Sequence, residues 1–186
     1  FKFIKFNINY DLNFLNKFIK KNKVDYIVDF LGQGMVAESW INPDHWYKTN
    51  ILSKVKMYDL LSKNKKFKKY IRISTPEAIG YAKGLISETT KSNPSTPYAI
   101  SHLTQDLTLL AYFKFNKFPF VISRFSNFYG PHQQPHRIIP KTLYCIFNKK
   151  KLSLHGGGKA IRSFIYIDDF CDGIYKSMTK GKPGEV

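Results

Sequence analysis

The sequence predicts an α/β fold built on a doubly wound parallel sheet. Two kinds of segment alternate along the chain: short apolar runs rich in β-branched residues, and longer runs with apolar residues at helical spacing. Strands that alternate with helices of this length form right-handed βαβ units, and these units build parallel sheets covered on both faces. With 186 residues, 43% of them apolar, the chain is long enough to bury a sizeable core.

The first half of the chain supplies a regular series of elements. Residues 1–8 alternate between apolar and polar types, as in a strand, and residues 12–22 have the spacing of an amphipathic helix. The run at 25–32 is continuously apolar, which is typical of a strand buried on both faces. A long helix is expected at 44–63, and another buried strand at 70–75.

The second half continues this series and then becomes less regular. A second long helix is expected at 96–116 and a third apolar strand at 118–127. Beyond residue 130 the pattern loosens, although a helix to about residue 148 and a returning strand and helix are still expected. We therefore expect two domains, residues 1–130 with the sheet and residues 131–186 as the start of a smaller region.

The net charge raises the question of nucleic-acid binding. Thirty Lys and Arg residues against 13 Asp and Glu residues give +17 at pH 7. The lysines come in runs at the ends of the expected helices, where cations suit the helix dipole and solvated faces are expected. No nucleic-acid-binding motif accompanies them, so we expect no nucleic-acid partner.

The composition also disfavours membrane and metal-binding proteins. No apolar run approaches the roughly 18 residues of a membrane span, and the first residues do not resemble a signal peptide. We therefore expect a soluble, cytoplasmic protein without a membrane partner. Cys145 and Cys171 stand singly in apolar surroundings, without the spacing of a metal or redox site, so neither a bound metal nor a disulfide is expected.

Polar or glycine-rich stretches follow the three buried strands. They lie at 32–35, 74–77 and 126–129. Ligands of open parallel sheets bind outside the carboxyl ends of the strands. The three stretches should therefore converge on one crevice, to which they bring backbone groups, a hydroxyl, a carboxylate, an amide and a phenol.

Seven motifs occur in a recognisable order. They are "NPDHWYKTN", "ISTPEAIG", "NPSTPYAISH", "RFSNFYGP", "RIIP", "HGGGKAIRSFIYIDD" and "KGKPGEV". In this order and spacing the chain resembles the NAD-dependent nucleotide-sugar epimerases and dehydratases, which are extended short-chain dehydrogenases, and most of all the dTDP-glucose 4,6-dehydratases. The resemblance implies that residues 1–130 are part of a Rossmann-like NAD-binding domain and residues 131–186 the start of the substrate-binding region.

One expected motif of this family has no counterpart in the sequence. The family opens with a strand, a G-x-x-G-x-x-G turn and a helix, which together bind the cofactor pyrophosphate. The resemblance therefore implies that Phe1 lies near the start of the third strand of the complete fold. We expect the chain to be the central portion of an enzyme that is longer at both ends.

The resemblance implies a catalytic group around Tyr98. This residue matches the tyrosine that serves as base for the sugar C4 hydroxyl, and Thr75 matches the hydroxyl that shares the substrate hydrogen bond. The family's Tyr-x-x-x-Lys is here Tyr98-x-x-x-His102, and one helical turn still places the histidine beside the tyrosine. A histidine with a pKa near 6.5 is mostly neutral at pH 7 unless an acidic neighbour raises that pKa. The alternative for Tyr98 is a half-buried aromatic residue at a helix start.

The segment around Glu77 leaves the outcome of the reaction open. Glu77 matches the dehydratase base that removes the C5 proton, but Pro76 stands in place of the acid that protonates the leaving C6 hydroxyl. Epimerases need no C5 base, and decarboxylases of this family keep the glutamate without the acid. A loop carboxylate is the alternative for Glu77, and a non-catalytic nucleotide-sugar binder is the alternative for the whole protein.

The same resemblance implies the binding residues. Those expected on the NAD side are Leu31, Gly32, Gln33, Tyr98 and His102. Those expected to contact the nucleotide-sugar substrate carry an amide or a guanidinium suited to a diphosphate, and they are Asn127, Arg137 and Arg162. Residues 155–158, "HGGG", read as a tight turn that lines the nucleotide pocket.

The two long helices carry more apolar surface than one face of a sheet can cover. Leu107 and Leu109 are examples on the second helix. Enzymes that the chain resembles pair these helices with their copies across a two-fold axis, so we expect a homodimer through 44–63 and 96–116. The alternative is that chain segments missing from this sequence cover them in a monomer.

Overall fold

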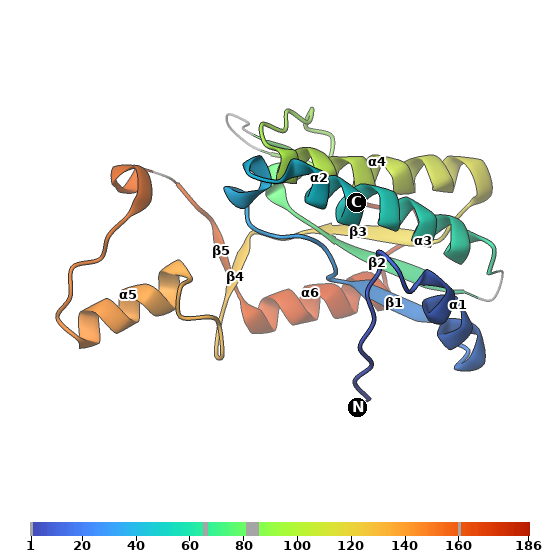
Figure 1. Ribbon diagram of the computed structural model, residues 1–186, viewed down its shortest axis with the longest axis horizontal. Helices are drawn as coiled ribbons and strands as arrows, with labels where there is room; N and C mark the ends of the chain where they lie inside the picture. Colours follow the sequence, from blue (N-terminus) through green and yellow to red (C-terminus); the bar gives the residue numbers. More distant parts are fainter. Residues whose placement is uncertain (1, 65–66, 81–85, 160) are drawn as a thin grey trace. The chain divides into compact units, whose positions relative to one another are not determined.

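The computed structural model describes residues 2–64, 67–80, 86–159 and 161–186, which form two compact units (Figure 1). The first unit contains Phe1–Arg124 and Ile174–Val186, and the second contains Phe125–Gly173. The chain thus leaves the first unit after its last strand and returns to it before its final residues. The domain ranges 1–130 and 131–186 remain a prediction.

The first unit is built on a parallel sheet. Its strands are β1 (Tyr26–Asp29), β2 (Lys69–Ser74) and β3 (Phe120–Arg124), in the order β1-β2-β3. Ile71 of β2 pairs with Val28 of β1 on one side and with Val121 of β3 on the other. The α/β fold with parallel strands that the alternating pattern predicts is confirmed.

In the described part of the chain, four α-helices precede or connect these strands. They are α1 (Leu12–Lys21), α2 (Pro43–Trp46), α3 (Ser53–Ser62) and α4 (Pro97–Asn116). The helix expected at 44–63 is α2 and α3 joined by a π-helical turn, η2 (Tyr47–Leu52). Helix α4 begins where the Thr96 side chain accepts a hydrogen bond from the Ala99 N–H at 3.1 Å, and Pro97 occupies the first helical position.

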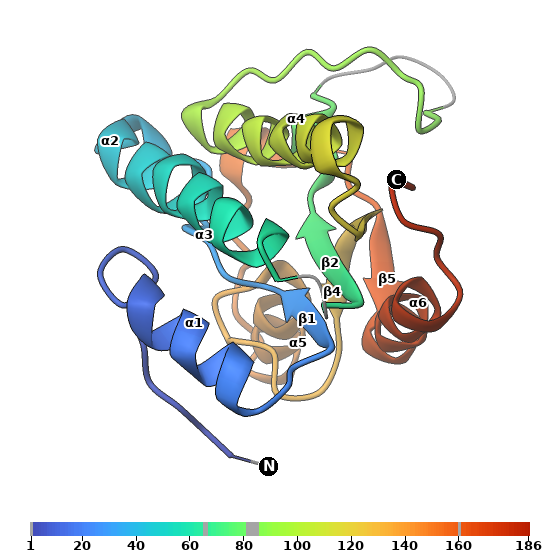
Figure 2. The same ribbon diagram turned by 90° about the vertical axis from the view of Figure 1, so that its right-hand side faces the viewer.

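Helices cover both faces of the sheet (Figure 2). On β3, Phe120 and Ile122 join the core formed with α3 and α4. The alternate residue Ser123 points the other way, where its Oγ lies 2.8 Å from the Oγ of Ser177 in the last turns of α6 (Ile167–Thr179). Because successive side chains of a strand point to opposite faces, this alternation places the last turns of α6, residues 174–179, opposite α3 and α4, as a doubly wound sheet requires.

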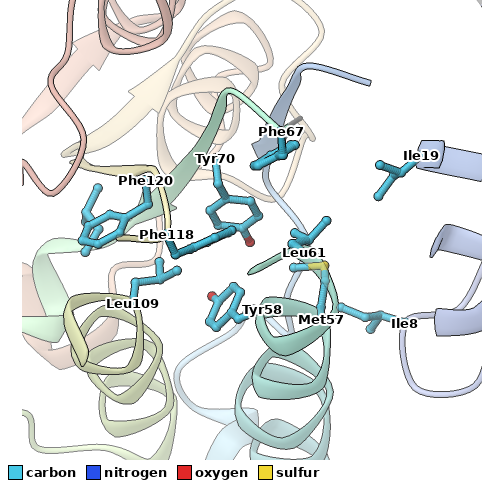
Figure 3. Packing of buried hydrophobic residues seen from close by; sticks show 11 residues of the cluster. Ile8, Ile19, Met57, Tyr58, Leu61, Phe67, Tyr70, Leu109, Phe118 and Phe120 are labelled. Atoms are coloured by element: carbon cyan, nitrogen blue, oxygen red, sulfur yellow. The ribbon is translucent and has the colours of Figure 1, made fainter. Parts of the chain in front are cut away.

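The core between the sheet and helices α3 and α4 is largely aromatic (Figure 3). The rings of Tyr58 and Tyr70 meet edge to face with centroids 5.5 Å apart, and those of Phe67 and Phe118 stack at 6.1 Å. The buried members of this core are Ile8, Ile19, Met57, Tyr58, Leu61, Phe67, Tyr70, Leu109, Phe118, Phe120 and Ile122.

The C-terminal segment lies along the free edge of β3. The Ile122 N–H donates to the Glu185 carbonyl at 3.0 Å, and the Gly184 N–H donates to the Phe120 carbonyl at 2.7 Å. Gly184 has φ +92°, and a Cβ at this position would lie 2.6 Å from the ring of Phe113. The close approach of this segment to α4 therefore requires glycine.

Two sequence predictions for strands are wrong. Residues 2–8 form no strand. Toward the end of this segment polar side chains bind the backbone locally: the Asn7 N–H donates to Asp11 Oδ2 at 2.7 Å, and the Asn9 N–H to Asn7 Oδ1 at 3.0 Å. The expected strand at 118–127 is divided into β3 and β4 (Asn127–Tyr129), which belong to different sheets.

The second unit contains a two-stranded parallel sheet and two short helices. Strand β4 pairs with β5 (Phe164–Tyr166), while α5 (Ile138–Phe147) and the 3-10 turn η4 (His155–Gly158) lie between them in sequence. Phe170, at the start of α6, is buried with its ring centroid 4.6 Å from those of Phe125 and Phe128. Among the described residues of both units, no helix has the length and apolar character needed to cross a bilayer.

We expect Leu109→Ala to lower the free energy of unfolding by about 2 to 5 kcal/mol, because the Leu109 side chain is fully buried among packed aromatic rings. Leu143, on α5, is 50% exposed, and Leu143→Ala should cost less than about 0.5 kcal/mol. Urea unfolding followed by circular dichroism measures both. Equal losses in the two variants would contradict the burial of Leu109.

Candidate active site

The loop after β1 is held in place by a buried asparagine. Asn50, in the π-helical turn, has no exposed surface; its Oδ1 accepts the Gln33 N–H at 2.7 Å and its Nδ2 donates to the Gln33 carbonyl at 3.1 Å. A Cβ on Gly32 would lie 3.1 Å from Asn50 Oδ1, so glycine allows the close approach. The Leu31 N–H donates to Asp29 Oδ1 at 3.0 Å. These bonds fix the three residues expected on the cofactor side, at the carboxyl end of β1.

Helix capping explains the conformation of the segment after β2. Thr75 is extended, as the residue before a proline prefers, and it caps the short helix η3 (Pro76–Ala78) with Pro76 at the first position. The Thr75 Oγ1 accepts the Glu77 N–H at 3.4 Å and donates its own proton to Glu77 Oε2. The structure therefore brings the hydroxyl and the carboxylate of the predicted site into direct contact, with an exposed proline between them.

Tyr98 and His102 lie one turn apart on the first half of α4. Their ring centroids are 4.4 Å apart, so the i, i+4 spacing does place the two side chains together. The Tyr98 N–H donates to Ser39 Oγ at 3.2 Å, and the Ser101 Oγ links the Tyr98 carbonyl at 2.7 Å to Asn50 Nδ2 at 3.0 Å. Helix α4 also packs against η3, which carries Glu77. The start of α4 is thus tied to the loops that follow β1 and β2.

His102 is neutral because it is half-buried and lies beside a guanidinium. The Nδ1 of His102 lies 2.7 Å from Arg72 Nη2. Burial, and then the charges of Arg72 and Lys54, lower the pKa of His102 to about 3. Since arginine has no acceptor, Nδ1 must accept the hydrogen bond, and the ring proton belongs on Nε2. A hydrogen bond between His102 and the backbone of Gln33 agrees with this assignment.

Arg72 belongs to a group of buried ionised side chains beneath the site. Its side chain is 1% exposed, and Lys54 of α3 is fully buried beside Asp29 of β1. The Lys54 Nζ donates to both carboxylate oxygens of Asp29, and the Tyr70 hydroxyl donates to Asp29 Oδ2. Burial alone would raise the pKa of Asp29, but Lys54 and Arg72 lower it below the usual value. Burial lowers the pKa of Lys54 to about 8, which leaves this side chain mostly charged at pH 7.

The other carboxylate of this group lies on α4. Asp106 is fully buried and accepts hydrogen bonds at Oδ2 from Ser74 Oγ at 2.7 Å and from Arg124 Nη2 at 3.2 Å. Its Oδ1 lies 3.8 Å from Arg72 Nε. Burial raises the pKa of Asp106, although the two arginines and the serine oppose this shift. We refer to Asp29, Lys54, Arg72, Asp106 and Arg124 as the buried charge cluster.

Sequence reasoning missed this cluster. The signals were a charged residue inside each of two apolar strands, Asp29 in "YIVDF" and Arg72 in "YIRIS". Charged side chains are almost never fully buried unless they are paired, so each of these residues required a partner. Asn50 was missed as well, and the sequence gives no local sign that its amide would bind the loop after β1.

The residues predicted to bind substrate phosphate lie in the second unit. Asn127 begins β4, and its Nδ2 donates to the Ser163 carbonyl at 3.4 Å, next to β5. Pairing of Asn127 with Phe164 brings Arg162 to the same end of this small sheet. Arg137 precedes α5, and all three predicted side chains are exposed. The "HGGG" stretch forms the 3-10 turn η4, with Gly157 and Gly158 at positive φ.

A family model described as the NAD dependent epimerase/dehydratase family matches residues 2–186. The chain belongs to this family. A dTDP-D-glucose 4,6-dehydratase of Dictyostelium discoideum is 33% identical over 200 residues, which cover 100% of this chain and 45% of that protein. The human dTDP-D-glucose 4,6-dehydratase is 30% identical over 187 residues, with coverage of 100% and 53%. The chain thus spans about half the length of the curated epimerase/dehydratase relatives it matches.

Solved structures of the epimerase/dehydratase family have the same fold. A dTDP-glucose 4,6-dehydratase of Streptomyces venezuelae, solved with NAD, superposes with a TM-score of 0.89 at 27% identity and covers 99% of this chain and 56% of its own. A UDP-glucuronic acid 4-epimerase of Bacillus cereus, solved with UDP-glucuronic acid and NAD, has a TM-score of 0.88 at 28% identity, with coverage of 100% and 59%. The likeness extends to both dehydratases and epimerases.

We expect His102 to make the protein less stable in acid. Its folded pKa of about 3 lies below the ordinary value of 6.5, so between these pH values the unfolded chain binds a proton that the folded chain does not. The free energy of unfolding should therefore fall as the pH falls through 6.5. From pH 7 to pH 5 the unmodified protein should lose roughly 1 to 2 kcal/mol more than His102→Gln.

Urea unfolding at the two pH values tests this difference. His136→Gln serves as the control, because His136 is exposed. Its loss of stability between pH 7 and pH 5 should match that of the unmodified protein. Equal losses in all three proteins would show that His102 is not held neutral.

Proposed function

We propose that this chain is the central portion of an NAD-dependent nucleotide-sugar 4,6-dehydratase or epimerase that acts through a 4-keto sugar. The observation that carries the proposal is the arrangement of Tyr98 and His102 at the start of α4, which packs against the helix bearing Glu77. Membership of the family and the likeness to dTDP-glucose 4,6-dehydratases and a UDP-glucuronic acid 4-epimerase support it. Under this proposal the substrate is a nucleotide sugar.

The loop after β1 suits a dinucleotide cofactor. It lies at the carboxyl end of a parallel strand, and its residues Gly32, Gln33 and Gly34 are exposed. No atom lies within 4 Å of a Cβ built on Gly34, while Trp46 Nε1 holds the Gly34 carbonyl at 3.0 Å, so the backbone is both accessible and ordered. Leu31, Gly32 and Gln33 would line the NAD side together with Tyr98 and His102. When bound, NAD supplies a hydride acceptor for sugar C4.

The residues around Tyr98 would handle protons. Under this proposal the Tyr98 hydroxyl, ionised, takes the proton of the sugar C4 hydroxyl. Thr75 donates a hydrogen bond to the same oxygen after its hydroxyl turns away from Glu77, to which it donates in this structure. The resulting C4 ketone makes the C5 proton acidic, and Glu77 is the base within reach of Thr75 that can remove it. Pro76 has no proton to give, so a dehydratase would need another acid for the leaving C6 hydroxyl.

The exposed groups of the second unit would bind the substrate diphosphate. Arg162 and Asn127 lie at the same end of the β4–β5 sheet, and Arg137 precedes α5. Guanidinium groups bind phosphate oxygens in pairs, and an amide adds a further donor. Asn127, Arg137 and Arg162 are therefore proposed as substrate-binding residues.

The proposed compartment is the cytoplasm, because Cys145 and Cys171 are both free thiols, as in proteins of reducing compartments.

A non-catalytic nucleotide-sugar binder is the second candidate. Two observations favour it: His102 is neutral where an active tyrosine needs a cation, and a proline occupies the position before Glu77. Incubation of the complete protein and NAD with a panel of dTDP- and UDP-sugars separates the two candidates. An enzyme forms a 4-keto product that is detected by absorbance, whereas a binder gives calorimetric binding without product.

We expect Tyr98→Phe in the complete protein to lower kcat for formation of the 4-keto product by about 100- to 10,000-fold, because the variant lacks the group that accepts the proton. Binding of the nucleotide sugar should stay within a few-fold of the unmodified protein. Tyr175→Phe is the matched control, since Tyr175 is 61% exposed on α6 and should retain full activity. Unchanged turnover by Tyr98→Phe would remove Tyr98 from the mechanism.

A homodimer through residues 44–63 and 96–116 is the proposed assembly. Helix α4 exposes Leu107 and Phe115, the latter by 90%, and the π-helical turn exposes Leu52 by 53%. A groove between the ends of α3 and α4, lined by Ala111, Tyr112 and Phe115 among others, adds to this apolar surface. Leu109, which the sequence analysis counts in the surplus, is instead fully buried in the protein's own core.

We expect Leu107→Glu to convert the dimer to a monomer, because the new carboxylate would be buried without a partner at the interface. Light scattering measures the mass of each protein. Phe3→Glu provides the control: Phe3 is 79% exposed outside both helices, and the variant should remain dimeric. A monomeric mass for the unmodified protein would refute the dimer, and a dimeric Leu107→Glu would place its interface elsewhere.

A further inference from the structure

A tyrosine that accepts a proton near neutral pH needs a positive charge close by, because its ordinary pKa is near 10. His102 touches the ring of Tyr98 but carries no charge. A fixed cation lies directly beside this histidine: Arg72 Nη2 is 2.7 Å from Nδ1 of His102. The order Arg72, His102, Tyr98 runs from the interior of the sheet toward the start of α4.

We propose that Arg72 is a positioning residue for Tyr98: it fixes His102 in the Nε2–H tautomer and supplies, from inside the sheet, the positive charge that favours the Tyr98 phenolate. This inference rests on the proposed function for the use of that phenolate. The contact between Arg72 and His102, and the tautomer that follows from it, are independent of any substrate.

The geometry limits Arg72 to one position. Its Nη1 donates to the Ile73 carbonyl, its Nε lies 3.8 Å from Asp106 Oδ1, and its Nη2 meets His102. Tyr98, His102 and Asp106 are spaced four residues apart, so they form one stripe along α4. The guanidinium therefore lies against this stripe between Asp106 and His102. A lysine ammonium could not make these contacts with the same planar, forked geometry.

The surrounding charges leave a positive excess on this side of the site. In the buried charge cluster three cations, Lys54, Arg72 and Arg124, face two carboxylates, Asp29 and Asp106. In an interior of low dielectric constant, a charge of this kind acts over several ångströms. Because the intervening His102 is neutral, the guanidinium charge acts on Tyr98 through space and not through a protonated histidine.

Other titratable groups near this end of α4 are on the elements packed against it. Among the described residues they are Glu38 on η1 (Glu38–Trp40), Asp44 and His45 on α2, Tyr47 and Lys48 on η2, and Glu77 on η3. Asp44 and His45 pair with one another at 3.7 Å and are largely exposed. Glu77 accepts the Thr75 hydroxyl proton.

The test measures ionisation directly, without substrate or cofactor. NMR of the complete protein with labelled tyrosine and histidine follows the pKa of Tyr98 and the tautomer of His102, with Tyr98→Phe and His102→Gln used for assignment. In the unmodified protein we expect a Tyr98 pKa below 10 and a proton on Nε2 of His102. A Tyr98 pKa of 10 or above, or a proton on Nδ1, overturns the proposal without any further variant.

Two variants then separate charge from shape. Arg72→Gln keeps a donor for His102 but removes the charge, and it should raise the pKa of Tyr98 enough to lower the phenolate population about tenfold at a given pH. Arg124→Gln removes a guanidinium that donates to Asp106, whereas Arg72 is the one that donates to His102, and this variant should change that population less than about twofold. Circular dichroism verifies folding of each variant. An unchanged Tyr98 pKa in folded Arg72→Gln overturns the proposal, as does an equal shift in both variants.

The outcome is distinguishable from failure of the proposed function. If the unmodified protein shows the lowered Tyr98 pKa and the Nε2–H tautomer but forms no product from any nucleotide sugar, the role of Arg72 stands and the enzyme assignment fails. If product forms while the Tyr98 pKa is ordinary, the enzyme assignment stands and the role of Arg72 is refuted.

Discussion

The pairing of buried charges between the sheet and its covering helices is the constraint on which the rest of the first unit depends. Asp29 lies on β1, Arg72 on β2, Lys54 on α3 and Asp106 on α4, and none of them is more than slightly exposed. Removal of one partner from such a group typically costs about 3 to 5 kcal/mol, because the other charge stays buried. Each helix is thereby held in one register against the strands, which sets where α4 presents Tyr98.

The alternation of segments was enough to predict the parallel sheet, since period and length separate strands from helices of this size. It failed where local side chains competed with strand pairing, as Asn7 and Asn9 do near the N-terminus. It failed again at Phe125, where the apolar pattern continues but the ring packs against Phe170 in the other unit's core. Hydrophobic periodicity indicates that a residue is buried, but it does not indicate which sheet or which core that residue joins.

In the candidate site, too, contacts within one helix or turn could be predicted from sequence spacing, whereas contacts between separate elements could not. The contact of Tyr98 with His102 follows from helical spacing, and the cap formed by Thr75 follows from a threonine before Pro76 and Glu77. The contact of Arg72 with His102 joins strand β2 to helix α4 and depends on the register of the helix against the strand. No spacing within the sequence encodes that register, so the lowering of the His102 pKa far below its ordinary value could be derived only from the fold.

The pairing of the C-terminal segment with β3 has a consequence for the order in which the protein is made. Val121 bridges to Glu185 on the free edge of its strand, yet the whole second unit lies between them in the sequence. During synthesis the apolar edge of β3 leaves the ribosome well before the segment that covers it. The nascent chain must therefore pass through a stage with an open strand edge, the form of a sheet most prone to pair with other chains.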